Sequence, residues 1–180
     1  MKKIGIAILT IGFSILGFSQ VIIGDEIGTA TNKTSVLLEF ANNQNKGIVL
    51  PYATTLPSGA KLAEGTILVS STDATKAKVM YYNGDWQDLS SGNEADISSA
   101  IINQPNITES TAVGAIIGAN SSSVDGVLVL ESATKAMVLP QVNSTDDIID
   151  PAPGMMVYIN KTGSQRLAVF NGAKWTYWMP

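Results

Sequence analysis

The sequence contains no cysteine and no histidine, and charged residues fill only 14% of its 180 positions. Without cysteine there is no disulfide framework and no thiol nucleophile, and without histidine the commonest general base and metal ligand are missing. It also carries no Gly-x-Ser-x-Gly elbow, phosphate-binding glycine loop or zinc signature. We therefore expect a protein that is not an enzyme and that uses no cofactor.

Basic residues are scarce, with 11 Lys and Arg against 15 Asp and Glu, which gives a net charge of −4. Nucleic-acid binding requires clustered Lys and Arg that neutralise phosphates, and this chain has no such cluster. We expect no nucleic-acid partner.

The chain repeats itself once. The segment KGIVLP at residues 46–51 returns 89 positions later as KAMVLP at residues 135–140. Matching segments follow in each copy, ending in an Asn-Gly pair at Asn83 and Asn171. The offset is 88 at Asn-Gly and 89 at the next Trp, so one residue is gained in the turn. Two copies of one module favour a structural or presenting protein over an enzyme with one asymmetric site.

The N-terminus predicts export. Lys2 and Lys3 precede an apolar run at residues 4–18, and Gly17 and Ser19 place small residues where a signal peptidase cuts. The run is shorter than the about 20 residues that span a bilayer. We expect a signal peptide at residues 1–19 and no transmembrane segment in the mature chain. Its removal takes two lysines and changes the net charge from −4 to −6. We place the product outside the cell or on its surface, with the periplasm as an alternative.

Strand signals dominate both copies. In each copy, two β-rich runs flank a polar turn, and an Asn-Gly pair, the strongest short hairpin signal, leads into a returning strand. The expected strands are residues 66–70, 77–82 and 86–89 in the first copy, and 155–159, 166–170 and 174–178 in the second. Strand-like segments at residues 36–40 and 127–131 precede them. Because the runs are apolar on both faces, we expect them to be covered on both sides.

Two further features organise the chain. Proline cannot donate a ladder hydrogen bond, so Pro51 and Pro140 should end edge strands. Between the copies, residues 93–103 resemble a short helix, with Asn93 as cap and Ile97 and Ile101 on one face. The predicted fold is all-β, with two related small β-meander modules at residues 20–89 and 115–180, joined by a Ser- and Asn-rich linker with one short helix at residues 90–114.

Each module is small. A unit of about 60 to 70 residues buries only about 60% of its unfolded surface and is marginally stable alone. We therefore expect self-association, with Ile97 and Ile101 packing against other copies. Docking of the two modules within one chain is the alternative.

Several motifs resemble a known family. The QVIIG start at residues 20–24, the KGIVLP segment and YNGDW at residues 82–86 are similar to a widespread family of secreted cell-surface proteins of the Bacteroidota. The later elements also resemble β-repeats of phage tail-fibre shafts and spikes, which are commonly homotrimeric. The resemblance implies a surface location, a repeated β-architecture and a homo-oligomer, with a trimer favoured. It implies no reaction.

Aromatic residues gather at the closing hairpins and are the candidate ligand or interface residues. Exposed rings stack on sugar faces, whereas rings alternating along strands usually belong to a core or an interface. The set comprises Tyr81, Tyr82, Trp86, Phe170, Trp175, Tyr177 and Trp178. Two functions remain open: a structural or assembly protein of the cell surface, and a tail-fibre-like module that binds a carbohydrate or a receptor for adhesion.

One acidic cluster, Asp146, Asp147 and Asp150, precedes the Pro-Ala-Pro stretch. We interpret it as a solvated turn, because the first copy has no acidic cluster there. A weak calcium site is the alternative, since carboxylates suit hard cations.

Overall fold

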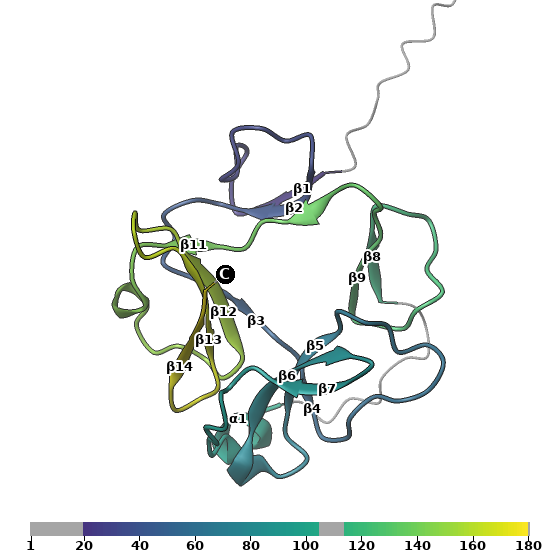
Figure 1. Ribbon diagram of the computed structural model, residues 1–180, viewed down its shortest axis with the longest axis vertical. Coiled ribbons are helices and arrows are strands. Elements are labelled where there is room, and N and C mark those ends of the chain that lie inside the picture. Colours follow the sequence, from purple (N-terminus) through teal and green to yellow (C-terminus); the bar gives the residue numbers. More distant parts are fainter. Residues whose placement is uncertain (1–19, 105–113, 180) are drawn as a thin grey trace, which may run out of the picture.

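Short strands are the main secondary structure in the computed structural model, which describes residues 20–104 and 114–179 (Figure 1). The strands form four sheets, and the one α-helix of the described chain is α1 (Ser98–Ile102). The predicted all-β class is confirmed.

Each copy of the repeat forms a four-stranded meander. In the first, β4 (Tyr52–Ala53) runs parallel to β5 (Ile67–Ser70), and β6 (Lys78–Asn83) and β7 (Asp85–Asp88) follow antiparallel. In the second, β11 (Gln141–Val142), β12 (Met155–Ile159), β13 (Arg166–Phe170) and β14 (Trp175–Trp178) pair in the same order and directions. Short 3₁₀ turns, Ala74–Lys76 and Thr145–Asp147, lie outside the strands.

The registers of the two meanders agree. Tyr52 lies opposite Val69, and its counterpart Gln141 lies opposite Tyr158. Every strand pair in the first meander has an equivalent in the second at offsets of 89 or 88 residues. The extra residue of the second copy falls between Phe170 and Trp175, within the turn. The sequence repeat is therefore a structural repeat.

Strand pairing also crosses from one copy to the other. One sheet holds β1 (Val21–Ile23), β2 (Val36–Phe40) and β10 (Ala136–Met137), all parallel. The segment β3 (Ile48–Val49) pairs antiparallel with β12. A two-stranded parallel sheet joins β8 (Ala115–Ile117) to β9 (Leu128–Leu130). Each copy thus supplies a strand to a sheet of the other, across the predicted module boundaries.

Apolar side chains cover both faces of the second meander. Met156 and Val169 join a core cluster that also contains Val69 and Val79 of the first meander. Val157 and Ala168 face the opposite way, into a second cluster with Val142, Ile148 and Ile159. The expectation of strands covered on both sides is confirmed for β12 and β13.

The prediction of a helix over residues 93–103 is wrong in its first half. Ala95 forms an isolated antiparallel bridge to Ala77, which keeps this stretch extended, and α1 begins only at Ser98. The carboxylate of Asp96, rather than Asn93, accepts the backbone N–H of Ser98 at 3.0 Å. Ile97 is 1% exposed and belongs to the core cluster of its own chain. The expectation that Ile97 packs against another copy is therefore also wrong.

The prolines and the Asn-Gly turns behave as expected. Both β3 and β10 end before Pro51 and Pro140, and both lie at sheet edges. The hairpin between β6 and β7 turns at Gly84, which has a φ of 77°. Gly172 has a φ of 113°, and the buried side chain of Asn171 accepts the N–H groups of Ala173 and Lys174.

A buried carboxylate holds the N-terminal loop. Glu39 on β2 is fully buried and accepts the backbone N–H groups of Thr29 and Ala30, both at 2.9 Å. Gln20 and Lys33 also donate to it, and Lys33 forms an ion pair with it. Burial by itself raises the pKa of Glu39, but the hydrogen bonds and the Lys33 charge outweigh it, so this pKa lies below its ordinary value.

We predict that Gly84→Val destabilises the protein by about 1–2 kcal/mol, because a β-branched residue at positive φ is strained. No heavy atom lies within 4 Å of a Cβ added at this position, so the cost comes from the backbone alone. Thermal or urea unfolding measures it. Gly84→Asn is the matched control, since Asn tolerates this conformation, and equal stability of the Val variant and the parent would contradict the turn geometry.

We predict that Glu39→Gln costs about 2 kcal/mol at neutral pH, because charged hydrogen bonds to the carboxylate are lost. A lowered folded pKa gives stability that is present above the unfolded pKa and lost as pH falls through the folded value. The penalty should therefore shrink below about pH 4. Urea unfolding at both pH values tests this prediction. Glu131→Gln is the matched control, since Glu131 is only half-buried and its carboxylate accepts from the Ser122 hydroxyl; an equal cost in both variants would contradict the special role of Glu39.

Candidate assembly surface

The hairpin aromatics lie in two groups, one at each closing turn. Tyr82 on β6 packs against Trp86 on β7 with ring centroids 5.4 Å apart. Phe170 on β13 packs against Trp175 on β14 at 5.2 Å. These four rings are half-buried, as is Tyr81. The structure therefore brings the predicted aromatics together as cross-strand pairs that brace each hairpin.

The two most exposed aromatics, Tyr177 and Trp178, are held by contacts within the chain. The Trp178 indole N–H donates to the Leu89 carbonyl at 3.1 Å. The Tyr177 hydroxyl lies 3.0 Å from Thr145 Oγ1, and the Arg166 guanidinium sits 4.4 Å above its ring. Because their polar groups and one ring face are already engaged, these rings suit packing better than stacking on a sugar. Their role as ligand or interface residues stays a prediction.

The acidic cluster lies around the 3₁₀ turn Thr145–Asp147. Ser144 and Asp147 form a capping box, in which the Asp147 carboxylate accepts the backbone N–H of Ser144 at 3.1 Å. Asp150 has a φ of 51°, which is typical of a turn. In residues 20–104 and 114–179 no group of three acidic, His or Cys side chains is placed to hold a metal ion. The geometry favours the interpretation as a capped turn.

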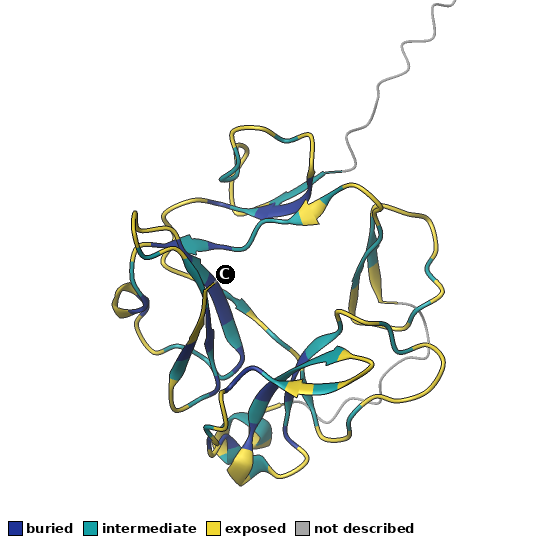
Figure 2. Cartoon of the chain, viewed as in Figure 1, coloured by how far each residue is buried: buried dark blue, intermediate teal, exposed yellow. Residues whose placement is uncertain are grey.

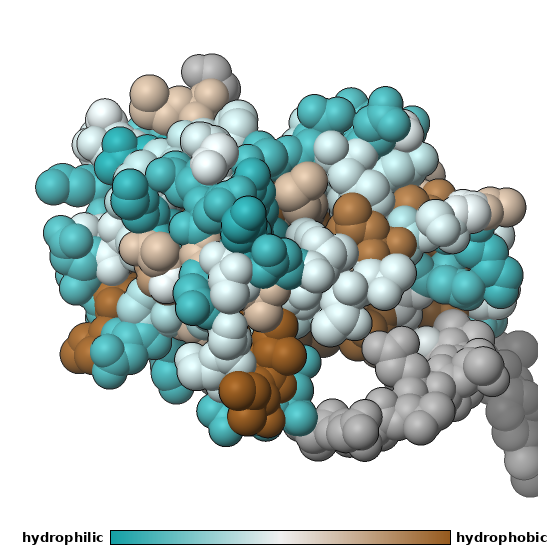
Figure 3. Space-filling view, turned by 90° about the horizontal axis from the view of Figure 1, so that it is seen from below, coloured by the Kyte–Doolittle hydropathy of each residue, from teal (hydrophilic) through white to brown (hydrophobic). Residues whose placement is uncertain are grey.

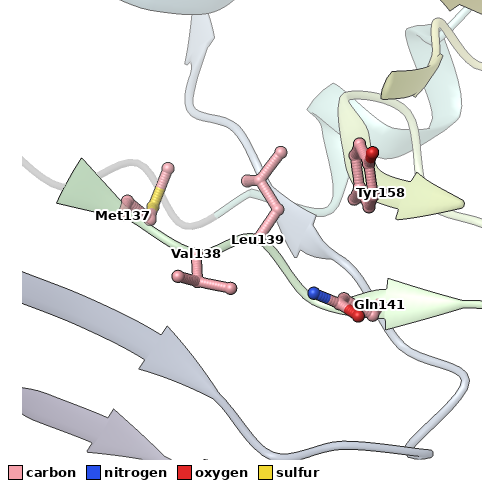
Figure 4. Close-up of a pocket in the computed structure, with 5 residues that line it drawn as sticks. All are labelled: Met137, Val138, Leu139, Gln141 and Tyr158. Atoms are coloured by element: carbon pink, nitrogen blue, oxygen red, sulfur yellow. The ribbon is translucent and has the colours of Figure 1, made fainter. Parts of the chain in front are cut away.

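A small cavity of about 290 Å³ lies where β10 leads into β11. It is lined by Met137, Val138, Leu139, Gln141 and Tyr158. Figure 4 shows Met137 and Leu139 pointing to one side of this segment and Val138 to the other. The lining contains no carboxylate and no pair of catalytic side chains. The cavity is therefore suited to contact with an apolar group and not to catalysis.

A second cavity, also about 290 Å³, lies between the two meanders. Its lining is almost wholly apolar and consists of Gly65, Ile67, Tyr81, Leu89, Leu167 and Trp178. Such a cavity, flanked by strand edges, can accept an apolar side chain of another segment.

The parallel sheets of the two copies differ sharply in burial. In the three-stranded sheet, Val36, Leu37 and Leu38 of β2 are at most 5% exposed. In the two-stranded sheet, Leu128 of β9 is 48% exposed and the preceding Val127 is 71% exposed. Figure 2 shows the contrast, with β2 dark blue and β8 and β9 in teal and yellow. The second copy therefore exposes apolar residues on a strand that has one partner, whereas the corresponding strand of the first copy is buried and has two.

Other exposed apolar groups are scattered. On the face drawn in Figure 3, brown apolar patches are separated by polar surface, so this side has no broad, continuous hydrophobic surface. No helix of the described chain has the length and apolar character that crossing a membrane requires. The surface features most suited to association are thus strand edges and their flanking side chains.

Contacts between the copies are polar as well as apolar. The Tyr52 hydroxyl donates to the Pro153 carbonyl at 2.9 Å, and burial raises the pKa of Tyr52. The buried Asn171 side chain of the second copy also donates to the carbonyl of Asn93, in the segment between the copies, at 2.8 Å. Sequence reasoning missed these contacts and the open strand edges, because no local pattern indicates which distant segment pairs with which.

Comparison with known proteins finds one similar family, and the match lies in the second copy of the repeat. Residues 116–180 match a family described as "Phage tail like trimerisation region". No curated protein and no solved structure matches the chain significantly. The matched region covers the second meander and the sheet of β8 and β9 almost completely. Residues 116–180 of this chain are therefore similar to a phage tail-like trimerisation region.

Proposed function

We propose that this protein is an exported, non-catalytic structural protein that assembles as a homotrimer at the cell surface. The observation that carries the proposal is the match of residues 116–180 to a phage tail-like trimerisation region, together with the open apolar strand edges in that same region. Strand edges that lack a partner are templates for pairing with another chain. Association through backbone pairing needs no catalytic group, in keeping with a chain that has no histidine or cysteine.

Export is the second part of the proposal. It rests on the basic start at Lys2 and Lys3, the apolar run at residues 4–18 and the small residues before Gln20. The absence of cysteine is compatible with an exported protein only if apolar burial and assembly supply its stability. Fractionation of cells, with sequencing of the mature N-terminus, tests this part separately: a product that stays in the cytoplasm with residues 1–19 attached would contradict it.

The adhesion alternative requires a row of free aromatic rings around a groove. The half-buried pairs Tyr82–Trp86 and Phe170–Trp175 and the tethered Trp178 support the structural function instead. A glycan array probed with the signal-free protein separates the two functions, since selective binding lost in a Tyr177→Ala variant would favour adhesion.

We predict that the protein from Gln20 onward has three times the mass of one chain in solution. The expected cause is pairing of open strand edges, which removes unpaired backbone groups and exposed apolar side chains from water. Size-exclusion chromatography with light scattering over a wide dilution series measures the mass. A monomer that unfolds cooperatively would contradict the trimer and leave docking of the two copies within one chain as the source of stability.

A further inference from the structure

The internal repeat allows the partner of each strand in one copy to be compared with that in the other. In the first copy, β3 pairs with the first half of β12, with Val49 opposite Met155 and Ile48 opposite Met156. The Leu50 N–H extends this pairing to the Gly154 carbonyl at 3.2 Å. The second half of β12 takes β11 on the same side. The segment that precedes Pro51 therefore completes the edge of the other copy's meander.

The equivalent edge of the first meander is open. Its strand β5 takes β4 along Val69 and Ser70 and takes β6 on its other side. On the β4 side of Ile67, no strand of the described chain is paired. By the repeat, the strand that belongs there is β10, with Val138 opposite Thr66, and with the Leu139 N–H directed at the Gly65 carbonyl.

The segment β10 has the matching edge free. The N–H groups of Ala136 and Val138 donate to the Ser35 and Leu38 carbonyls, both at 2.8 Å, so these groups face β2. Successive residues of a strand direct their N–H groups to opposite sides, which places that of Leu139 on the other edge. Leu50, its counterpart, uses that edge to bind β12. One strand can therefore bind β2 and a β5 edge at once.

The apolar cavity between the meanders lies at the edge that lacks a strand. In the first copy, Ile48 packs against the core cluster that contains Met156 and Val169. The counterparts of those two residues are Ile67 and Tyr81, which line the cavity of about 290 Å³. The counterpart of Ile48 is Met137. A Met137 side chain therefore fits the position and the apolar character of this cavity.

We call an open strand edge that is filled in the other copy a vacancy. The edge of β5 is the first vacancy, and the edge of β9 is the second. The sheet of β2 contains β10 as its third strand, whereas β9 has β8 alone. By the repeat, the strand missing beside β9 is β3. The side chain of Val49 on β3 is 51% exposed, and Leu128 on β9 is 48% exposed. Pairing β3 with β9 would remove part of both side chains from water.

We propose that both vacancies are filled by a second copy of this chain through reciprocal strand exchange. The strand β10 of one protomer joins the β5 edge of its neighbour, and β3 of that neighbour joins β9 of the first. Both exchanges connect the second repeat of one protomer to the first repeat of the next, so they form one interface. This interface is heterologous and closes only as a ring. The proposal rests on the proposed function, since three protomers close that ring.

Cysteine cross-linking tests the exchange, because the native chain has no cysteine. Val49 and Met155, the template pair, are a non-hydrogen-bonded pair, since the adjacent Leu50 and Gly154 are bonded. Such pairs have Cα atoms about 4.5 Å apart, within the range for a disulfide. We expect Thr66→Cys combined with Val138→Cys to give covalent dimers and trimers on a non-reducing gel. Val49→Cys combined with Met155→Cys is the matched control and should give a disulfide within one chain, which migrates as a monomer.

The outcomes separate this inference from the proposed function. A trimer by light scattering in which the Thr66→Cys, Val138→Cys double variant forms no disulfide between chains overturns the exchange and leaves the trimer standing. A disulfide within one chain of that double variant also overturns it. A monomeric mass overturns both the trimer and the exchange. Co-expressed single variants, Thr66→Cys and Val138→Cys, should form a mixed dimer that neither gives alone.

A second measurement does not depend on a disulfide. Met137→Glu places a charge in the apolar cavity and should raise the protomer concentration needed for assembly by at least about tenfold. Ile149→Glu is the control, since Ile149 is 87% exposed and lies outside both vacancies. Circular dichroism checks that both variants keep their β-structure. Equal assembly of the two variants would overturn the placement of Met137.

Discussion

The structure depends on the pairing of strand edges between the two repeats. A strand edge presents a row of N–H and C=O groups that must find partners in protein or water. Neither meander closes on itself, so β3 of the first copy completes the second meander, and β10 of the second copy completes the sheet of β1 and β2. The meanders then share one core, in which Val69 and Val79 meet Met156 and Val169.

Polar contacts fix the path of the loop between β1 and β2, which apolar burial alone does not specify. The sheet of β1, β2 and β10 is anchored by the buried carboxylate of Glu39, which gathers the loop between β1 and β2 through backbone N–H groups and Lys33. A buried carboxylate without partners would be costly, so the loop must take this path for Glu39 to stay buried. The counterpart Glu131 receives the Ser122 hydroxyl and is only half-buried. The less anchored sheet is also the one with exposed strands.

The sequence predicted the meander strands well because their signals are local. Residues 155–159 and 166–170 were expected as strands and are β12 and β13. The short parallel strands β4 and β11 were missed, since two residues carry no periodicity and their partners lie at least 17 positions away. The helix at residues 93–103 was overextended, because the bridge from Ala95 to Ala77 is a tertiary contact that overrides local propensity. The aromatics could be located because they lie within local hairpins. The open edges of β5 and β9 could not, because they depend on which distant segments pair.

Repetition explains why association follows from the fold. Within the described residues the two repeats receive different strands: the second meander takes β3 and the sheet of β2 takes β10, while the edges of β5 and β9 stay open. The filled position in one copy is therefore the vacant position in the other, as the buried Val36 of β2 and its counterpart, the half-exposed Leu128 of β9, illustrate. A closed ring of chains supplies a strand to each open edge through the same kinds of strand pairing that the chain already contains. The interactions that join the repeats within a chain are then the ones available to join the chains.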